Sequence, residues 1–166
     1  MQSYNRYSAY LIIIDSALQQ VWAFLTATKA PPIAIMHAFL MKFGLVKGVI
    51  RTNQGGELAR SNKFCAVMMN KFNYTVEPTG SDSPLQNGGT EIYNGTLAVK
   101  VWMLLYGSGL PAKFWSAALL HSVYLHNRLI HLAVGITPYK GWYGRKPDVT
   151  YLKTFRLCMC VRQSGS

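Results

Sequence analysis

The sequence predicts a single α/β domain, and three patterns predict it. Residues 10–14 form a continuous apolar run rich in β-branched side chains, which is typical of a buried strand. Residues 58–72 and 90–106 instead carry apolar side chains at three- and four-residue intervals, which is typical of helices packed on a sheet. Proline and glycine separate these segments, and the order of strands and helices indicates the α/β class.

Four strands and two helices are expected up to residue 77. Residues 21–25 follow a polar turn and are expected to pair antiparallel with residues 10–14. Two prolines at 31–32 open a helix, and Gly44 ends it. The remaining predicted elements are a strand over 48–51, a helix over 58–72 and a strand over 74–77.

Residues 78–89 contain proline, glycine and serine and are predicted to form a mobile loop. Thr90 then caps a helix over 90–106, and Glu91 lies in its first turn, where the helix dipole stabilises a carboxylate. Gly-Ser-Gly at 107–109 ends this helix, and another helix is expected over 111–128. The predicted apolar stripes are Tyr93, Leu97, Val101 and Leu104 on the first helix, and Trp115, Ala118, Leu119, Ser122 and Leu125 on the second.

Length and composition restrict the class of protein. A chain of 166 residues suits one domain with a real core, and 50% hydrophobic against 14% charged residues excludes a disordered chain. Lysine and arginine number 17 and aspartate and glutamate 6, which gives a net charge of +11. This charge favours a polyanionic partner such as nucleic acid. The alternative is that it only aids solubility or reflects the loss of acidic residues.

The cysteines and the apolar segments indicate an intracellular protein. Cys65, Cys158 and Cys160 are odd in number, and no secretory signal is expected before them, which indicates a reducing compartment. Cys158 and Cys160 are too close and too isolated for a zinc site, and His121 and His126 are expected to pack within a helix. No apolar segment reaches the ~20 residues that span a membrane.

Two motifs carry most of the functional information. Residues 51–57 read Arg-Thr-Asn-Gln-Gly-Gly-Glu, and residues 84–91 read Pro-Leu-Gln-Asn-Gly-Gly-Thr-Glu. They resemble the second and third carboxylate motifs of the integrase core of copia-type (Pseudoviridae) retrotransposons, roughly R-T-D-N-G-G-E-F and P-x-Q-N-G-x-x-E. Asn53 stands where that family has a metal-binding aspartate, and Glu91 matches the glutamate of the third motif.

Later segments continue the resemblance, which covers residues 10–161 in order. Residues 110–115 resemble the family's L-P-x-x-F-W, and residues 124–128 resemble Y-L-x-N-R. Residues 137–139 and 144–147 resemble T-P-Y-E and G-x-K-P. Asn127 and Arg128 are expected to position their helix rather than to touch DNA.

The resemblance implies metal-dependent polynucleotidyl transfer, with two Mg²⁺ or Mn²⁺ ions held by carboxylates. Mg²⁺ prefers anionic oxygens, whereas Asn53 offers one neutral carbonyl oxygen. Residues 1–9 contain no acid to match the family's first aspartate. Asp15 is the only alternative substitute, but it matches an aspartate that is not a ligand in the family. Glu91 is then the one remaining metal ligand of three, and inactivity is expected.

The same resemblance suggests how the domain contacts DNA. Residues 86–89 correspond to the flexible active-site loop, while Ile92 and Gly95 stand where the family commonly has basic residues. The candidate DNA-binding residues are therefore Arg51, Gln86, Asn87, Gly88 and Lys100. Other basic residues that would add to such a surface are Lys113, Arg128, Arg145, Lys146, Lys153 and Arg156.

The implied fold is an RNase H-like mixed sheet flanked by helices, without its first central strand. Residues 1–9 are a remnant N-terminal segment, residues 10–130 the catalytic core-like domain, and residues 131–166 a C-terminal extension. Three alternatives remain for the missing strand. Residues 1–9 pair poorly in its place, the two flanking strands close up, or the chain is one fragment of a longer product.

The function expected from these observations is that of a degenerate integrase core, ancestrally active in DNA integration and nuclear when functional. One alternative is a non-catalytic protein that binds nucleic acid and retains the basic fold. Another is a protein-interaction remnant, in which the apolar helices form a homo-oligomer interface.

Overall fold

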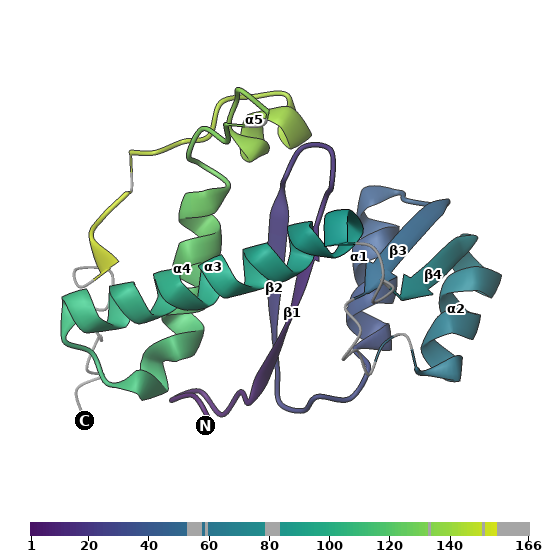
Figure 1. The fold of residues 1–166 in the computed structure, drawn as a ribbon, viewed down its shortest axis with the longest axis horizontal. Helices are drawn as coiled ribbons and strands as arrows, with labels where there is room; N and C mark the ends of the chain where they lie inside the picture. The colour runs from purple at the N-terminus through teal and green to yellow at the C-terminus, as the bar shows by residue number, and fades with distance from the viewer. Residues whose placement is uncertain (53–57, 59, 79–83, 133, 151, 156–166) are drawn as a thin grey trace, which may run out of the picture.

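The computed structural model describes residues 1–52, 58, 60–78, 84–132, 134–150 and 152–155 (Figure 1). These residues form a mixed arrangement of helices and two small sheets, which confirms the predicted α/β class. Within them, no helix is both long enough and apolar enough to cross a bilayer.

A hairpin of β1 (Ala9–Ile14) and β2 (Val21–Thr26) runs through the middle of the molecule (Figure 1). The two strands are antiparallel, as predicted, and their register extends from Ala9 opposite Thr26 to Ile14 opposite Val21. Because side chains alternate along a strand, Ile12 and Ile14 pack into one hydrophobic cluster while Leu11 and Ile13 pack into another. The hairpin is therefore covered on both faces, which explains why residues 10–14 are continuously apolar.

Helices α1 (Ile33–Phe43) and α2 (Asn62–Phe72) build the cluster on the face of Leu11 and Ile13. Gly44 adopts a left-handed conformation with φ of 62° and ends α1, as predicted. Ser61 caps α2, because its hydroxyl oxygen accepts a hydrogen bond from the Phe64 N–H. The buried side chains of this cluster are Met36, Phe39, Leu40, Phe64, Met68 and Phe72.

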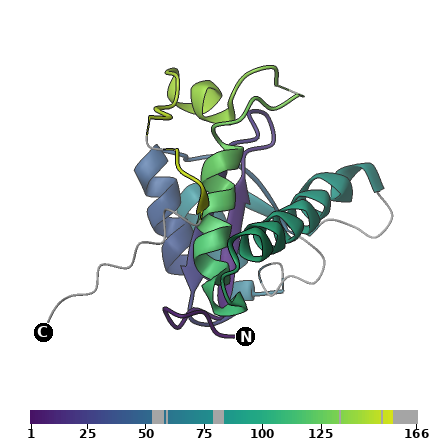
Figure 2. The same ribbon diagram turned by 90° about the vertical axis from the view of Figure 1, so that its left-hand side faces the viewer.

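Helices α3 (Pro84–Ser108) and α4 (Trp115–His126) build the cluster on the face of Ile12 and Ile14. Figure 2 shows α1 on one side of the hairpin and α3 on the other. A short 3₁₀ turn, η1 (Ala112–Phe114), leads into α4, and α5 (Pro138–Tyr143) follows later in the chain. The buried residues of this cluster are Val21, Leu97, Val101, Leu105, Ala118, Leu119, Val123 and Phe155.

Strands β3 (Gly48–Thr52) and β4 (Tyr74–Pro78) form a second sheet and pair in parallel. Helix α2 is the crossover between them, as a parallel pair requires. The predicted single mixed sheet is not formed by the described residues. Instead, two two-stranded sheets are present, because no described strand lies between β1 and β3.

The N-terminal segment does not supply that strand. The Tyr4 N–H donates to the Lys113 carbonyl oxygen at 2.9 Å, and the Ser116 hydroxyl donates to Asn5 Oδ1 at 3.0 Å. The Tyr4 ring also lies 4.9 Å from the Phe114 ring. These contacts hold the start of the chain against η1 and α4.

Three predicted helix starts are wrong. The helix expected over 111–128 begins as an α-helix only at Trp115, because a separate 3₁₀ turn precedes it. Helix α2 begins at Asn62 instead of residue 58, because the Ser61 cap fixes its first turn. Helix α3 begins at Pro84 instead of after Thr90, so residues 84–89 are helical rather than part of a mobile loop. Proline suits a first helical turn, and the packing of the later turns of α3 outweighs the low helix propensity of glycine. Helix α5 was not predicted.

Candidate functional site

A cleft of about 710 Å³ lies where β1, the end of β3 and α3 meet. Its volume is within the range of roughly 300–1,000 Å³ that is typical of ligand sites. Strand β1 contributes consecutive residues to its wall, β3 contributes Thr52, and α3 contributes Asn94 and Trp102. The other described lining residues are Met1, Ser8, Thr26, Thr28, Lys29, Ala30, Pro32, Leu58, Ala112 and Trp115.

This cleft adjoins both motifs identified in the sequence. Thr52 is the residue before Asn53, and Asn94 follows position 91 by three residues, about one helical turn. Thr52 and Asn94 line the same cleft although an entire helix and strand separate them in the chain. The end of β3 and the first half of α3 therefore converge.

The lining chemistry is poorly suited to a divalent cation. Among its described residues the cleft offers threonine and serine hydroxyls, the amide of Asn94 and the ammonium of Lys29, without a carboxylate. Across the described part of the chain, no group of three or more histidine, cysteine, aspartate or glutamate side chains could hold a metal. A hard cation requires several anionic oxygens, and the residues that the resemblance assigns to the metal, Asn53 and the side chain of Glu91, lie outside the described part of the structure.

The predicted catalytic residues have different placements. Asn53 lies outside the described residues. Glu91 belongs to helix α3, but its side chain is not described. Asp15 follows β1 in the hairpin turn, where its Oδ2 accepts the Leu18 N–H at 2.6 Å. The cleft is lined by the first part of β1, up to Ile12, which lies about 10 Å from Asp15 at the usual rise per residue. This placement gives Asp15 a turn-stabilising role.

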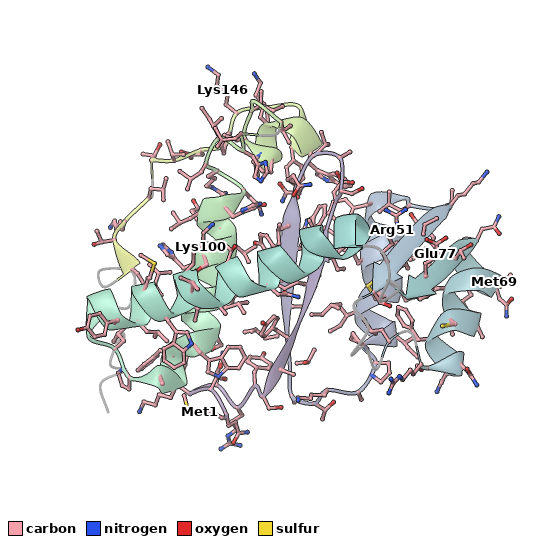
Figure 3. The ribbon with its side chains drawn as sticks, viewed as in Figure 1. Met1, Arg51, Met69, Glu77, Lys100 and Lys146 are labelled. Carbon is pink, nitrogen blue, oxygen red and sulfur yellow. The ribbon has the colours of Figure 1, made fainter. Side chains whose placement is uncertain are left out.

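The candidate DNA-binding residues come from two elements, β3 and α3. Gln86, Asn87 and Gly88 lie in the first turns of α3. Arg51 lies on β3 with its Nε 3.7 Å from Glu77 Oε2, and both side chains are about half exposed. Figure 3 places Arg51, Lys100 and Lys146 on three separate parts of the molecule. Any polyanion that contacts all three must therefore extend across the molecule.

A second polar cluster lies where α3, α4 and the hairpin turn meet. The His126 Nε2–H donates to the Gln19 carbonyl oxygen at 3.0 Å, and the His126 ring lies 5.0 Å from Tyr93 and 5.7 Å from His131. Burial lowers the pKa of His126, and burial raises the pKa of Tyr93. Both groups are thereby held neutral, which is consistent with the predicted packing role of His126.

Arg128 packs against aromatic rings and joins two parts of the fold. Its guanidinium carbon lies 3.4 Å from the centre of the Tyr124 ring and 5.2 Å from that of Tyr139. The guanidinium also donates to the carbonyl oxygens of Tyr124 and Asp148. These contacts join α4 to the segment around α5, as expected of a residue that positions its helix.

Sequence reasoning named none of the described lining residues of the cleft as a site residue, including Lys29, Asn94 and Trp102. Asn94 had a detectable signal, because it follows Glu91 at a helical interval. Lys29 and Trp102 had no such signal in the sequence, since only the tertiary arrangement brings the loop after β2 next to α3.

Comparisons with known proteins identify the fold. No family model matches the chain. A chain in the solved structure of the simian T-cell lymphotropic virus intasome in complex with the PP2A regulatory subunit B56 gamma is similar, with a TM-score of 0.64 and 17% identity. The match covers 93% of this chain and 56% of that chain, so this chain spans little more than half of its length. The likeness shows a shared fold, related to that of a retroviral intasome component.

Proposed function

We propose that this chain is an integrase core-like domain of copia type that binds DNA but does not join it. The observation that carries the proposal is the cleft between the end of β3 and α3. It lies next to both integrase-like motifs, and its described lining residues include no carboxylate. The fold shared with a retroviral intasome chain supports the integrase-related part of this proposal.

The expected lack of DNA joining follows from the metal ligands that the sequence offers. Asn53 offers a neutral amide oxygen where the family has an anionic ligand, so it would hold less tightly the metal ions that neutralise the charge developing on a phosphoryl group. The chain's own residues therefore contribute substrate binding and orientation rather than phosphodiester chemistry. The net charge of +11 supports binding to a polyanion.

Incubation with a labelled oligonucleotide duplex and Mg²⁺ or Mn²⁺ tests the catalytic half of the proposal. We expect neither nicking nor joining by the wild-type protein. Asn53→Asp restores an anionic ligand, so Mn²⁺ titration followed by electron paramagnetic resonance should detect tighter binding by that variant. Strand transfer by the wild-type protein that Glu91→Gln abolishes would overturn the proposal.

The salt dependence of duplex binding tests the other half. Each neutralised phosphate contributes about −0.9 to the slope of log K against log salt. We expect a slope steeper than about −3, because the basic residues are spread over several elements and a duplex would contact more than one of them. Binding that is independent of salt, or no binding at low salt, contradicts the assignment to DNA.

A protein-interaction role is the second candidate, and the outer face of α3 favours it. Trp102, Met103 and Tyr106 on this face are 61%, 68% and 92% exposed. Large apolar side chains gathered on one face often mark an interface. Sedimentation equilibrium distinguishes the two functions, since a stable dimer that is indifferent to added DNA would favour protein interaction.

A further inference from the structure

The segment around α5 carries exposed positive charge. It contains two of the motifs found in the sequence, at residues 137–139 and 144–147, to which the proposed function gives no role. Lys140, Arg145 and Lys146 are exposed, and Figure 3 shows Lys146 at the outer end of this part of the molecule. Residues 128–153 include one acidic residue, Asp148, so most of this charge is not balanced locally.

Helix α5 is held firmly against the β1–β2 hairpin turn (Figure 1). The centroid of the Trp142 ring lies 4.7 Å from that of Trp22 and 5.6 Å from that of Phe43. A Cβ atom at residue 141 would lie 3.1 Å from Leu18 Cδ2, so the helix backbone approaches the turn closely. The side chains on the outer side of α5 are therefore presented on a fixed support.

Two tyrosines lie one helical turn apart on α5. The ring centroids of Tyr139 and Tyr143 are 4.6 Å apart, and their planes meet at 40°. The Arg128 guanidinium carbon lies 5.2 Å from the Tyr139 ring, and Arg145 Nη2 donates to Tyr139 Oη at 3.5 Å. Tyr139 is thus held by its neighbours, whereas Tyr143 is 43% exposed. Tyr143 therefore offers an aromatic ring to solvent beside exposed cations.

We propose that this surface binds single-stranded nucleic acid, with an unpaired base stacked on the Tyr143 ring. The flanking phosphates would be neutralised by the exposed cations, and rings beside cations are the combination that binds single strands in other proteins. The α5 surface is defined as Tyr139, Lys140, Tyr143, Arg145 and Lys146. None of these five residues lines the cleft, so this binding does not depend on the proposed binding of duplex DNA.

A single strand fits the α5 surface better than a duplex or an acidic peptide does. In a duplex the neighbouring bases cover both faces of each base, so a protein ring can stack on a base only after it is unstacked. An acidic peptide could neutralise the cations, but it supplies no flat ring with each charge. Each nucleotide supplies one base and one phosphate, which matches an exposed ring beside cations.

Fluorescence anisotropy with a labelled thymidine strand of about eight nucleotides tests the stacking. Tyr143→Ala should weaken binding about fivefold or more, because one base stacked on an aromatic ring contributes at least that much. Tyr143→Phe keeps the ring and should bind like the wild-type protein. Tyr106→Ala is the matched control, because Tyr106 on α3 is 92% exposed and lies outside the α5 surface. It should leave the affinity unchanged.

A strand of the same length without bases separates stacking from charge. It carries the same phosphates, so it should bind the wild-type protein more weakly than the thymidine strand does. Tyr143→Ala should not weaken it further, since no base is present to stack. A uridine strand distinguishes the two kinds of nucleic acid: tighter binding identifies RNA as the ligand, and equal binding identifies the chemistry that RNA and DNA share.

The salt dependence of single-strand binding tests the cations. Each neutralised phosphate of a single strand contributes about −0.7 to the slope of log K against log salt. Lys140→Ala and Lys146→Ala should therefore each reduce the magnitude of the slope by about 0.7. Lys47→Ala is the matched control, because Lys47 is exposed and precedes β3, and it should leave the slope unchanged.

Three results would overturn the inference, provided that thermal denaturation shows each variant to be folded. The first is an unchanged affinity of Tyr143→Ala for the thymidine strand. The second is equal binding of the thymidine strand and the strand without bases. The third is an equal loss of duplex and single-strand affinity in Tyr143→Ala, which would assign the α5 surface to duplex DNA. Absence of duplex binding alone would contradict the proposed function and not this inference.

Discussion

The side chain of Asn127 binds both backbone groups of Val21, although the two residues lie at opposite ends of the core sequence. Its Oδ1 accepts the Val21 N–H at 2.9 Å, and its Nδ2 donates to the Val21 carbonyl oxygen at 2.7 Å. Both residues are buried. The amide thus pairs the outer edge of β2 with the end of α4, where another strand would otherwise be required.

Replacement of Asn127 by alanine should strongly destabilise the fold. The change leaves a buried N–H and a buried C=O of Val21 without partners, which costs about 2–4 kcal/mol of unfolding free energy. Urea denaturation followed by circular dichroism measures this loss. Asn62→Ala at the exposed start of α2 is the control and should change stability by less than about 0.5 kcal/mol. Equal losses in the two variants would contradict the role of Asn127.

The stability of the protein should fall as the pH drops below about 6.5, in part because of His126. Burial lowers the pKa of His126 in the folded state below its ordinary value of 6.5. The unfolded chain therefore takes up the proton more readily, so the stability is complete above pH 6.5 and is lost toward the folded pKa. Burial lowers the pKa of His121 in the same direction.

Urea midpoints at pH 7.5 and pH 5.5 measure this effect. His126→Gln should reduce the difference between the two midpoints, because glutamine can still donate to the Gln19 carbonyl oxygen but does not titrate. His37→Gln on α1 is the matched control and should retain the full difference. An unchanged difference in His126→Gln would exclude His126 as a source.

Arg128 should affect stability more than DNA affinity. Arg128→Ala removes the stack on Tyr124 and Tyr139, with an expected loss of about 1–2 kcal/mol in unfolding free energy. Arg128→Lys keeps the charge but lacks the planar group, so it should recover less than half of this loss. A fall in duplex affinity much larger than that caused by Lys47→Ala, without loss of stability, would instead place Arg128 at a DNA interface.

Gly48 should not tolerate a side chain while Tyr74 is present. A Cβ atom at residue 48 would lie 2.7 Å from Tyr74 Cε1 on the neighbouring strand. Gly48→Ala should therefore cost about 1–3 kcal/mol, and the cost should fall by at least about 0.5 kcal/mol when Tyr74 is also alanine. Thermal denaturation of the four proteins of this cycle gives the coupling.

Gly95→Ala is a control that should raise the stability of the protein, whereas Gly48→Ala should lower it. Gly95 lies within α3, and a Cβ atom there meets nothing within 4 Å. The substitution should stabilise the helix by up to about 1 kcal/mol. Additive effects of Gly48→Ala and Tyr74→Ala would show that the two side chains do not compete for space.

The elements up to residue 77 could be predicted because their signals are local. The apolar run of β1, the prolines before α1 and Gly44 after it each act within a few residues. The start of α3 could not be predicted, because glycines at 88 and 89 and prolines nearby indicate a loop on local grounds. Helix α5 is short and lacked an amphipathic pattern, although Thr137 caps it through the Lys140 N–H.

Less of the candidate site could be predicted. The motifs identified the end of β3 and the first half of α3, because their residue order is a linear signal. The contributions of Lys29 and Trp102 depend on how the loop after β2 lies against α3, which no local pattern encodes. The sequence left open whether the strands that flank the missing central strand close up, since strand neighbours are a tertiary property.

Within the described residues β1 pairs only with β2, which has a consequence for how the purified protein behaves in concentrated solution. A strand edge is a template for other strands, so copies of the domain can associate edge to edge. The net charge of +11 opposes this association, because like-charged molecules repel one another over roughly 10 Å at 0.1 M salt. Added salt shortens that range, so precipitation should begin at lower protein concentration as ionic strength rises.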